Sequence, residues 1–527
     1  LNVDEGTAPA ELSQITKGHE RVAVINWKEY VLEEAYLSLN SDPKGLLDFL
    51  FKKYGRHIST DAHQSFDLVL YEIPPSTDFS IAHRLEAVSV DFGGALRLEG
   101  VALGGSSVHD TSTEQDVESE TLPSGKEGWV VLQWRALGGL DANYKVAVYL
   151  LDGQGRVAGQ TDKLLLSNHL EPTSNWDPQQ LEIDYYTLPS QPATPPGRYA
   201  AQVAVYDANT LERLPIFDAQ TGASTTSVAI GELEVAKPLT PPEIRPLEEL
   251  PSSQGSVAPG LQLLGYDAPV RAASPGETVR VALYWRATED LTEDYLLSVG
   301  LRSEEQTIWL EQNQHPVNGT YPTNEWEAGE VLRDWHDLRL PPDTPPGTHE
   351  VLLRVLEGGE TLGQVSLGSI ELSGRPRRFD IPEIQHPVDA RLGDAVLFLG
   401  YDLSSEEAKP GDTLHLTLYW QALEEMQVSY TVFTHLLDAE GEIWGQMDSI
   451  PGRGEAPTTS WVEGEIIADD YEIVVDPGAP AGEQLIEIGM YDPAVGERLP
   501  VFNRRGESEG NRVLLRATPL VVVAGSR

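Results

Sequence analysis

Four landmarks recur three times along the chain at nearly constant spacing, and this repetition limits the possible folds more than any other feature. The first landmark is a tryptophan that ends an alternating apolar segment, at Trp134, Trp285 and Trp420. A tyrosine follows ten residues later, at Tyr144, Tyr295 and Tyr430. A second tryptophan lies 41 or 42 residues after the first, at Trp176, Trp326 and Trp461, and a turn glycine 21 residues further on, at Gly197, Gly347 and Gly482. Landmarks held in register in this way mark three diverged copies of one module.

The apolar segments before the first tryptophan alternate with a period of two. Val279, Val281, Leu283 and Trp285 share one face of an extended chain, and the residues between them share the other. Turn sequences such as Ser274-Pro275-Gly276 separate these segments. The pattern predicts a mainly β fold, with three tandem β-sandwich modules of the immunoglobulin or fibronectin type III kind after a small α/β unit.

The repeats also predict the domain boundaries. We place the three sandwich modules at 84–236, 241–374 and 376–525, joined by short segments that contain proline. Such linkers favour semi-rigid, end-to-end domains over independent tumbling.

Residues 1–80 have a different pattern and predict the small α/β unit. Arg21–Asn26 and Asp67–Ile73 read as strands. Between them, Asp42-Pro43-Lys44 is expected to cap a helix that carries an apolar stripe and stops at Gly55. A unit of this size buries little surface by itself, so we expect it to lean on the first module or to be the tail of a larger domain.

The charge balance limits the possible partners. The chain has 83 acidic and 37 basic residues, a formal net charge of -46, and the acidic residues are spread along its whole length. This field repels phosphate backbones and anionic lipids, so nucleic acid and bare membrane are not expected partners, whereas divalent cations or a cationic surface fit better. There are no cysteines, which excludes disulfides, thiolate metal sites and cysteine nucleophiles.

The chain offers no membrane-spanning segment, because no run of about 18 apolar residues occurs in it. It begins at Leu1 without a methionine or an apolar leader, from which we expect processing or excision from a longer polypeptide.

Several of these motifs resemble one protein family. The strand Leu418–Ala422, the Pro-Thr-x-x-Trp element, the Pro-Pro-Gly turn and the segment Gly489–Val501 look like the C-terminal extracytoplasmic region of large bacterial membrane glycosyltransferases of the polyprenyl-phosphate-sugar, mannosyltransferase-like, Chloroflexi type. Lys53–Arg56 and Leu70–Glu72 are similar to the piece that joins the last membrane helix of those enzymes to such modules. The resemblance implies an extracytoplasmic location, at the cell surface or secreted. The catalytic carboxylates of that family lie between membrane helices, so the resemblance assigns no catalytic residue here.

The tryptophans are the main candidates for binding residues, since aromatic rings stack on sugars. We expect the six tryptophans that define the repeat to pack in the cores, because Trp134, Trp285 and Trp420 fall on inward faces. Trp309 and Trp444 each lie 24 residues after a strand tryptophan, where the first copy has Ala158. Each follows an isoleucine, so alternation is expected to turn both to the outer face as a contact surface. The competing interpretation is that each is covered by a loop of its own module.

No pattern predicts a catalytic or metal site. Histidines are scattered, and no His-Glu-x-x-His, Gly-x-Ser-x-Gly or phosphate-binding loop occurs. We therefore predict no catalytic residues, no metal ligands and no cofactor, with calcium left open because acidic loops of sandwich domains often bind it. A glycosidase with paired carboxylates is the weakest alternative.

The leading functional hypothesis is a non-catalytic accessory region of a cell-envelope glycosyltransferase-like protein that positions or binds glycans. The alternative is a structural surface protein whose modules self-assemble into a layer or filament, so that the partner is a glycan or a cell-surface protein, including another copy of this chain.

Overall fold

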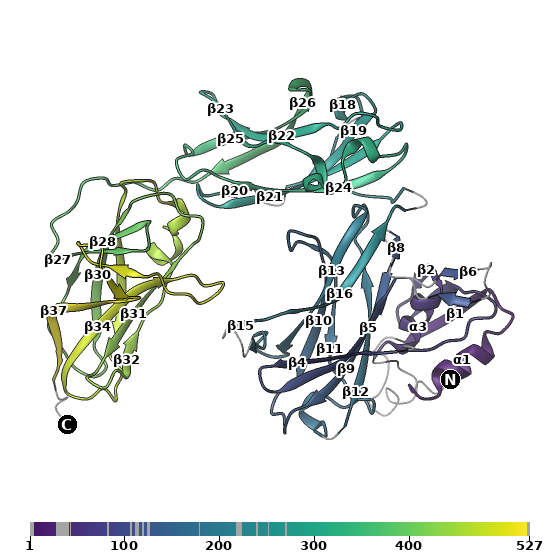
Figure 1. Ribbon diagram of the computed structural model, residues 1–527, viewed down its shortest axis with the longest axis horizontal. Helices are drawn as coiled ribbons and strands as arrows, with labels where there is room; N and C mark the ends of the chain where they lie inside the picture. Colours follow the sequence, from purple (N-terminus) through teal and green to yellow (C-terminus); the bar gives the residue numbers. More distant parts are fainter. Residues whose placement is uncertain are drawn as a thin grey trace. The chain divides into compact units, whose positions relative to one another are not determined.

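The computed structural model describes residues 5–27, 42, 44–81, 84–105, 108–110, 115–117, 121–123, 127–178, 180–217, 224–238, 241–250, 252–268 and 271–523. Their fold is mainly β, as predicted, with sandwich modules that follow a small N-terminal unit (Figure 1). Residue contacts divide the chain into two compact units. One comprises Leu1–Gly265, Leu283–Tyr295 and His315–Asp334, and the other comprises Tyr266–Ala282, Leu296–Gln314 and Trp335–Arg527.

The N-terminal unit is a three-stranded antiparallel sheet with two helices. Its elements are α1 (Ala8–Ile15), β1 (Arg21–Trp27), α3 (Leu46–Tyr54), β2 (Arg56–Ala62) and β3 (Phe66–Glu72), and the sheet order is β1-β3-β2. The two predicted strands and the helix that ends before Gly55 are confirmed. Helix α1 and strand β2 were not predicted.

Helix α3 begins at Leu46, with Gly45 rather than the predicted segment Asp42–Lys44 at its N-cap, but the Asp42 side chain still contributes to the cap. The Asp42 carboxylate accepts hydrogen bonds from the amides of Leu46 and Leu47 at 2.7 and 2.6 Å. These amides have no partner within the helix, so an acceptor placed there stabilises the first turn. Pro43, the other residue proposed for this cap, lies outside the described residues.

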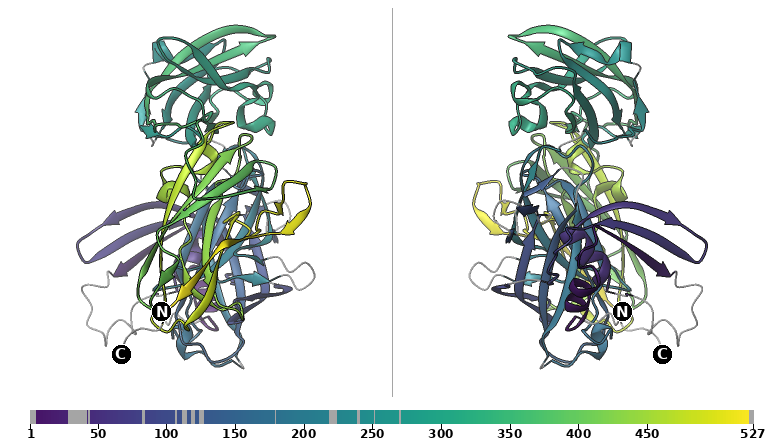
Figure 2. Two further views of the ribbon diagram at one scale, coloured as in Figure 1. Left: turned by 90° about the vertical axis from the view of Figure 1, so that its left-hand side faces the viewer. Right: turned by 90° about the vertical axis from the view of Figure 1, so that its right-hand side faces the viewer.

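The N-terminal unit packs directly on the first module. Phe49 and Leu50 of α3 form one buried cluster with Trp129, Val131 and Tyr185 of that module, and the Lys53 ammonium group lies 4.0 Å from the centre of the Trp129 ring. The side views show the purple strands of this unit beside the blue strands of the first module (Figure 2). The expectation that a unit of this size leans on the first sandwich is therefore confirmed.

The first module contains two sheets. One has the order β12-β9-β5-β4, and the other β11-β10-β13-β16-β8. Two short ribbons, β6-β7 and β14-β15, accompany them. The strands are β4 (Glu86–Phe92), β5 (Leu96–Gly104), β6 (Val108–Asp110), β7 (Gln115–Val117), β8 (Thr121–Pro123), β9 (Glu127–Ala136), β10 (Tyr144–Leu151), β11 (Val157–Leu164), β12 (Glu182–Pro189), β13 (Gly197–Asp207), β14 (Ile216–Phe217), β15 (Ser224–Thr225) and β16 (Val228–Ala236).

The second module also contains two sheets. They have the orders β17-β19-β21-β24, with β18 paired to β19, and β20-β26-β25-β22-β23. The elements are β17 (Glu248–Glu249), α4 (Ser252–Gly255), β18 (Ser256–Ala258), β19 (Leu261–Asp267), β20 (Ala272–Ala273), β21 (Thr278–Ala287), β22 (Leu296–Arg302), β23 (Thr307–Gln314), β24 (Val331–Arg339), β25 (Gly347–Glu357) and β26 (Glu360–Leu372).

The third module repeats the arrangement, with sheets β33-β30-β28-β27-β35-β36 and β29-β37-β34-β31-β32. Its strands are β27 (His386–Leu392), β28 (Val396–Leu403), β29 (Glu407–Ala408), β30 (Thr413–Ala422), β31 (Thr431–Leu437), β32 (Ile443–Gln446), β33 (Ile466–Val474), β34 (Gly482–Tyr491), β35 (Val501–Phe502), β36 (Ser508–Gly510) and β37 (Val513–Val522).

The tryptophans of the repeat are core residues. Trp134, Trp285 and Trp420 are each 0% exposed. Trp134 lies opposite Glu182 of β12, and Trp420 lies opposite Ile467 of β33, which is the equivalent register. The predicted core packing of these side chains is confirmed.

The Pro-Thr-x-x-Trp element is a short 3-10 turn locked by its threonine and its tryptophan. Thr173, Thr323 and Thr458 are buried, and each accepts a hydrogen bond from the amide of the repeat tyrosine at 2.7 to 3.0 Å. The indole nitrogens of Trp176, Trp326 and Trp461 each donate to a carbonyl five residues earlier at 2.8 to 3.1 Å. These tryptophans are buried too, so the prediction that they pack is also confirmed.

Candidate functional site

Trp309 faces outward, as the alternation predicted. It lies on the edge strand β23 opposite Gly300 of β22, whose neighbours Val299 and Leu301 are buried. The Arg354 guanidinium carbon lies 4.0 Å from the centre of the Trp309 ring. A cation over an indole face is stabilising, so one face of this ring is already occupied within the second module. The binding role proposed for Trp309 stays a prediction.

The outward orientation expected for Trp444 is wrong. Trp444 packs against the core cluster of the third module, whereas the preceding Ile443 is 49% exposed. Its indole nitrogen donates a hydrogen bond to Asp438 at 2.7 Å. The interpretation that Trp444 is covered by its own module fits this geometry.

A β-bulge explains why two tryptophans at the same sequence spacing differ. In the third module Leu437 pairs with Ile443 and Leu436 with Gly445, so Trp444 is the extra residue of a bulge. The first module has the same irregularity at Ala158. In the second module Leu301 and Gly300 pair with Ile308 and Trp309 without a bulge at that point. A shift of one residue turns a side chain to the other face of a sheet, so the two tryptophans are not structurally equivalent.

The outer face of sheet β11-β10-β13-β16-β8 in the first module is hollowed by a groove. Its volume is about 300 Å³, and we call it the outer groove. The residues that line it are Ala147, Tyr149, Gln160, Thr161, Asp162, Tyr206, Leu211 and Arg213. All of them belong to one sandwich module, so the groove is complete within it.

Strand register places the side chains of Ala147, Tyr149, Asp162 and Tyr206 on the side of the sheet away from the core. On β10, Val146, Val148 and Leu150 are in the core cluster, so Ala147 and Tyr149 point outward. Ala147 lies opposite Asp162 of β11 and Ala204 of β13, and both alanines are buried. The groove forms because small alanine side chains lie at its bottom and larger tyrosine side chains stand beside them.

Hydrogen bonds fix the walls of the outer groove. The Tyr206 hydroxyl donates to Asp162 at 2.5 Å, and the Arg213 guanidinium group donates to the Tyr149 hydroxyl at 3.0 Å. Burial raises the pKa of the Tyr206 phenol above its usual value of 10.0, and the hydrogen bond to the Asp162 carboxylate adds to the effect. Tyr206 therefore stays protonated at neutral pH, and its hydroxyl donates the hydrogen bond that holds the side chain beside Asp162.

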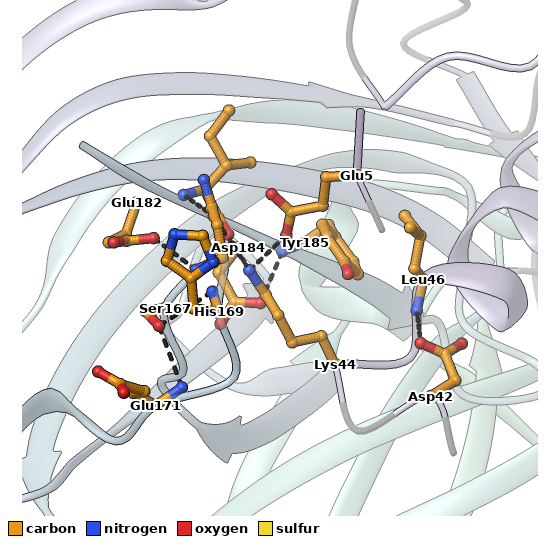
Figure 3. A network of polar contacts seen from close by, with 12 residues as sticks. Glu5, Asp42, Lys44, Leu46, Ser167, His169, Glu171, Glu182, Asp184 and Tyr185 are labelled. Atoms are coloured by element: carbon orange, nitrogen blue, oxygen red, sulfur yellow. Dashed lines mark hydrogen bonds and ion pairs between the residues drawn. The ribbon is translucent and has the colours of Figure 1, made fainter. Parts of the chain in front are cut away.

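A second polar cluster lies where the N-terminal unit meets the first module. Lys44 is buried and pairs with Glu5 at 2.5 Å, and it also donates to the Ile183 carbonyl at 2.5 Å (Figure 3). Lys163 pairs with Asp184 at 2.8 Å and donates to the Lys44 carbonyl at 2.7 Å. Burial raises the pKa of the Glu5 carboxyl, and the charge of Lys44 opposes this. The charged groups of this cluster pair with one another, so we interpret the cluster as a structural contact that holds the N-terminal unit on the first module.

Among the described residues, no group of three or more histidine, aspartate or glutamate side chains is arranged to hold a metal ion. No helix that the structure describes is long and apolar enough to cross a bilayer. Calcium binding by the acidic loops, which the sequence left open, is not tested by this geometry.

Sequence reasoning missed the outer groove because its walls come from strands that are distant along the chain. One signal was available: Tyr149 and Tyr206 both occupy outward positions of alternating strands. The segment Glu212–Pro215 also recurs as Glu497–Pro500, which marks a hairpin common to the first and third modules.

Comparisons with known proteins add little to this geometry. No protein-family model and no curated protein matches the chain. Among solved structures, a crystal structure described as "Putative membrane anchored protein from Corynebacterium diphtheriae" is similar at 10% sequence identity, with 81% of this chain and 92% of that chain covered and a TM-score of 0.15. A TM-score this low supports no argument about function.

Proposed function

We propose that this chain is a non-catalytic, extracytoplasmic accessory region of a cell-envelope glycosyltransferase-like protein, and that it binds or positions glycans. The observation that carries the proposal is the outer groove of the first module, with its two tyrosines, one carboxylate and one guanidinium group.

The side chains of the groove suit a sugar. A pyranose ring has a flat face of C–H groups that packs on an aromatic ring, and its hydroxyl groups lie around the edge. Tyr149 and Tyr206 offer rings, Asp162 offers hydrogen-bond acceptors and Arg213 offers donors. A few polar groups around an apolar centre is the usual composition of a small-molecule site.

The same side chains are poorly suited to catalysis of glycoside hydrolysis. That reaction uses two carboxylates on either side of the scissile bond. Asp162 is the one carboxylate among the residues that line the groove, and Tyr206 already donates a hydrogen bond to it. Binding without turnover is the function that fits this arrangement.

The test is a binding measurement on the whole purified chain. A panel of cell-envelope oligosaccharides is titrated by calorimetry against the wild type and against Tyr149→Ala, with Phe217→Ala as the control. Phe217 is an exposed aromatic residue of the same module that does not line the groove. We expect binding that Tyr149→Ala weakens and Phe217→Ala preserves. Absence of binding to every glycan, with self-association of the chain instead, would contradict the proposal.

A further inference from the structure

The first and third modules share a hairpin that brings an arginine over the outer face. Tyr206 forms an isolated bridge with Arg213, and Tyr491 forms the equivalent bridge with Arg498. The amide of Leu214 bonds to the Val205 carbonyl, as the amide of Leu499 bonds to the Met490 carbonyl. The two arginines therefore occupy the same place in their modules.

In the third module, a phenylalanine ring lies beneath this arginine. Phe433 is 1% exposed although it belongs to the outer face of β31, where its neighbour Val432 is in the core. The guanidinium carbon of Arg498 lies 4.0 Å from the centre of the Phe433 ring.

A glycine makes room for that ring. Phe433 pairs with Gly489 of β34, and a Cβ at Gly489 would lie 2.5 Å from the Phe433 ring. The ring of Tyr491 stands beside it, 6.4 Å away between ring centres. The third module thus fills its own groove with a six-membered ring under an arginine.

The first module has the same slot without the ring. Ala147 pairs with Ala204 as Phe433 pairs with Gly489, so Ala147 is the counterpart of Phe433. Tyr206 is the counterpart of Tyr491, and Arg213 that of Arg498. Exchange of phenylalanine for alanine removes a whole ring, and Ala147 is one of the residues that line the outer groove.

We infer that the outer groove is a slot for one six-membered ring supplied by a ligand, and that this ring is a neutral pyranose. The inference rests on the proposed function and names the ligand class of its site. The position of the slot is inferred from the third module, where the six-membered ring of Phe433 lies beneath Arg498.

The rim of the slot offers hydrogen-bonding groups that a sugar can use, namely Gln160, Asp162 and Arg213. The third module keeps a rim of the same kind around its apolar ring, because Gln446, Asp448 and Arg498 hold the equivalent positions. A phenyl ring makes no hydrogen bond to such groups, and a pyranose makes several. Charge favours a neutral sugar, because a net charge of -46 repels uronates and phosphosugars.

The test copies the third module into the first. In the variant Ala147→Phe/Ala204→Gly, the added ring should occupy the slot, and in Tyr149→Ala one wall is removed. Neutral oligosaccharides, an anionic oligosaccharide and tyrosinamide are each titrated against the full-length wild type, both variants and Phe217→Ala. Thermal unfolding checks that each variant is folded.

We expect neutral oligosaccharides to bind the wild type and Phe217→Ala equally, and to bind the filled variant and Tyr149→Ala about tenfold or more weakly. If neutral glycans bind the folded filled variant as well as the wild type, the slot is wrong and the proposed function survives at another site. If tyrosinamide or the anionic glycan binds in the slot and the neutral sugars do not, the ligand class is wrong. If no ligand binds, both proposals fail.

Discussion

The indole nitrogen of Trp420 donates a hydrogen bond to the buried carboxylate of Asp469 at 3.3 Å. Trp285 and Asp334 repeat this contact at 3.4 Å in the second module. In the first module the equivalent Asp184 keeps the tyrosine contact, from Tyr186, but pairs with Lys163 in place of the tryptophan. The buried Trp134 nitrogen has no hydrogen-bond partner among the described residues. Lys163 also donates to the Lys44 carbonyl, so the change accompanies docking of the N-terminal unit.

Asp469→Asn should lower the free energy of unfolding of the third module by about 1 to 3 kcal/mol. The Asp469 carboxylate accepts hydrogen bonds from Trp420, Tyr471 and the Gly452 amide, and an asparagine amide has one acceptor oxygen for these three donors. Chemical denaturation measures the change. Asp470→Asn, which alters an exposed neighbour on the same strand, is the control and should change it little; equal losses in the two variants would contradict the assignment.

The pH dependence of stability should reveal the ionisation of His435. The hydrogen bond that His435 donates to Asp448 raises the pKa of His435 above its usual value of 6.5, burial opposes this, and the hydrogen bond that it donates to Glu487 adds to it. The folded state thus holds this proton more tightly than the unfolded state, so the stabilisation is present below pH 6.5 and is lost as the pH rises through the higher folded value. Chemical denaturation at pH values from about 5 to about 9 should show this loss of unfolding free energy in the wild type and a smaller loss in His435→Gln. The same slope in both proteins would exclude His435 as its source.

Trp309→Ala and Trp444→Ala form a matched pair with different expected costs. Trp309 lies on an outer face and loses mainly its contact with Arg354, worth about 0.5 to 1 kcal/mol. Trp444 loses core packing and its bond to Asp438, so about 1 to 3 kcal/mol is expected. Thermal unfolding compares the two variants, and a greater loss for Trp309→Ala would contradict the bulge assignment.

Lys44→Met should loosen the N-terminal unit from the first module. The substitution leaves the carboxylate of Glu5 and the Ile183 carbonyl without their buried partner, at a cost of about 3 kcal/mol. Hydrogen exchange should then accelerate in α3 and in β1 to β3. The exposed Lys17→Met serves as the control, and unchanged protection of α3 in Lys44→Met would show that the apolar contacts alone hold the unit.

The sequence was sufficient for the architecture, because the repeat tryptophans and the alternation around them report directly on burial. The aspartates that bond to these tryptophans were not predicted, since Asp469 looks like any other acidic residue until β30 and β33 are paired. The bulge at Trp444 was equally hidden, because one extra residue changes the face of a side chain without changing the spacing of the landmarks. The outer groove could not be predicted either, because its walls are known only once β10 is placed between β11 and β13.

A crystal structure of the chain with the neutral oligosaccharide that binds it most tightly would show directly whether the outer groove holds a sugar. We predict one pyranose ring over Ala147, beneath Arg213 and against Tyr149 or Tyr206, with its hydroxyl groups bonded to Asp162. A sugar bound elsewhere, at Trp309 for example, with the outer groove holding only water, would contradict it.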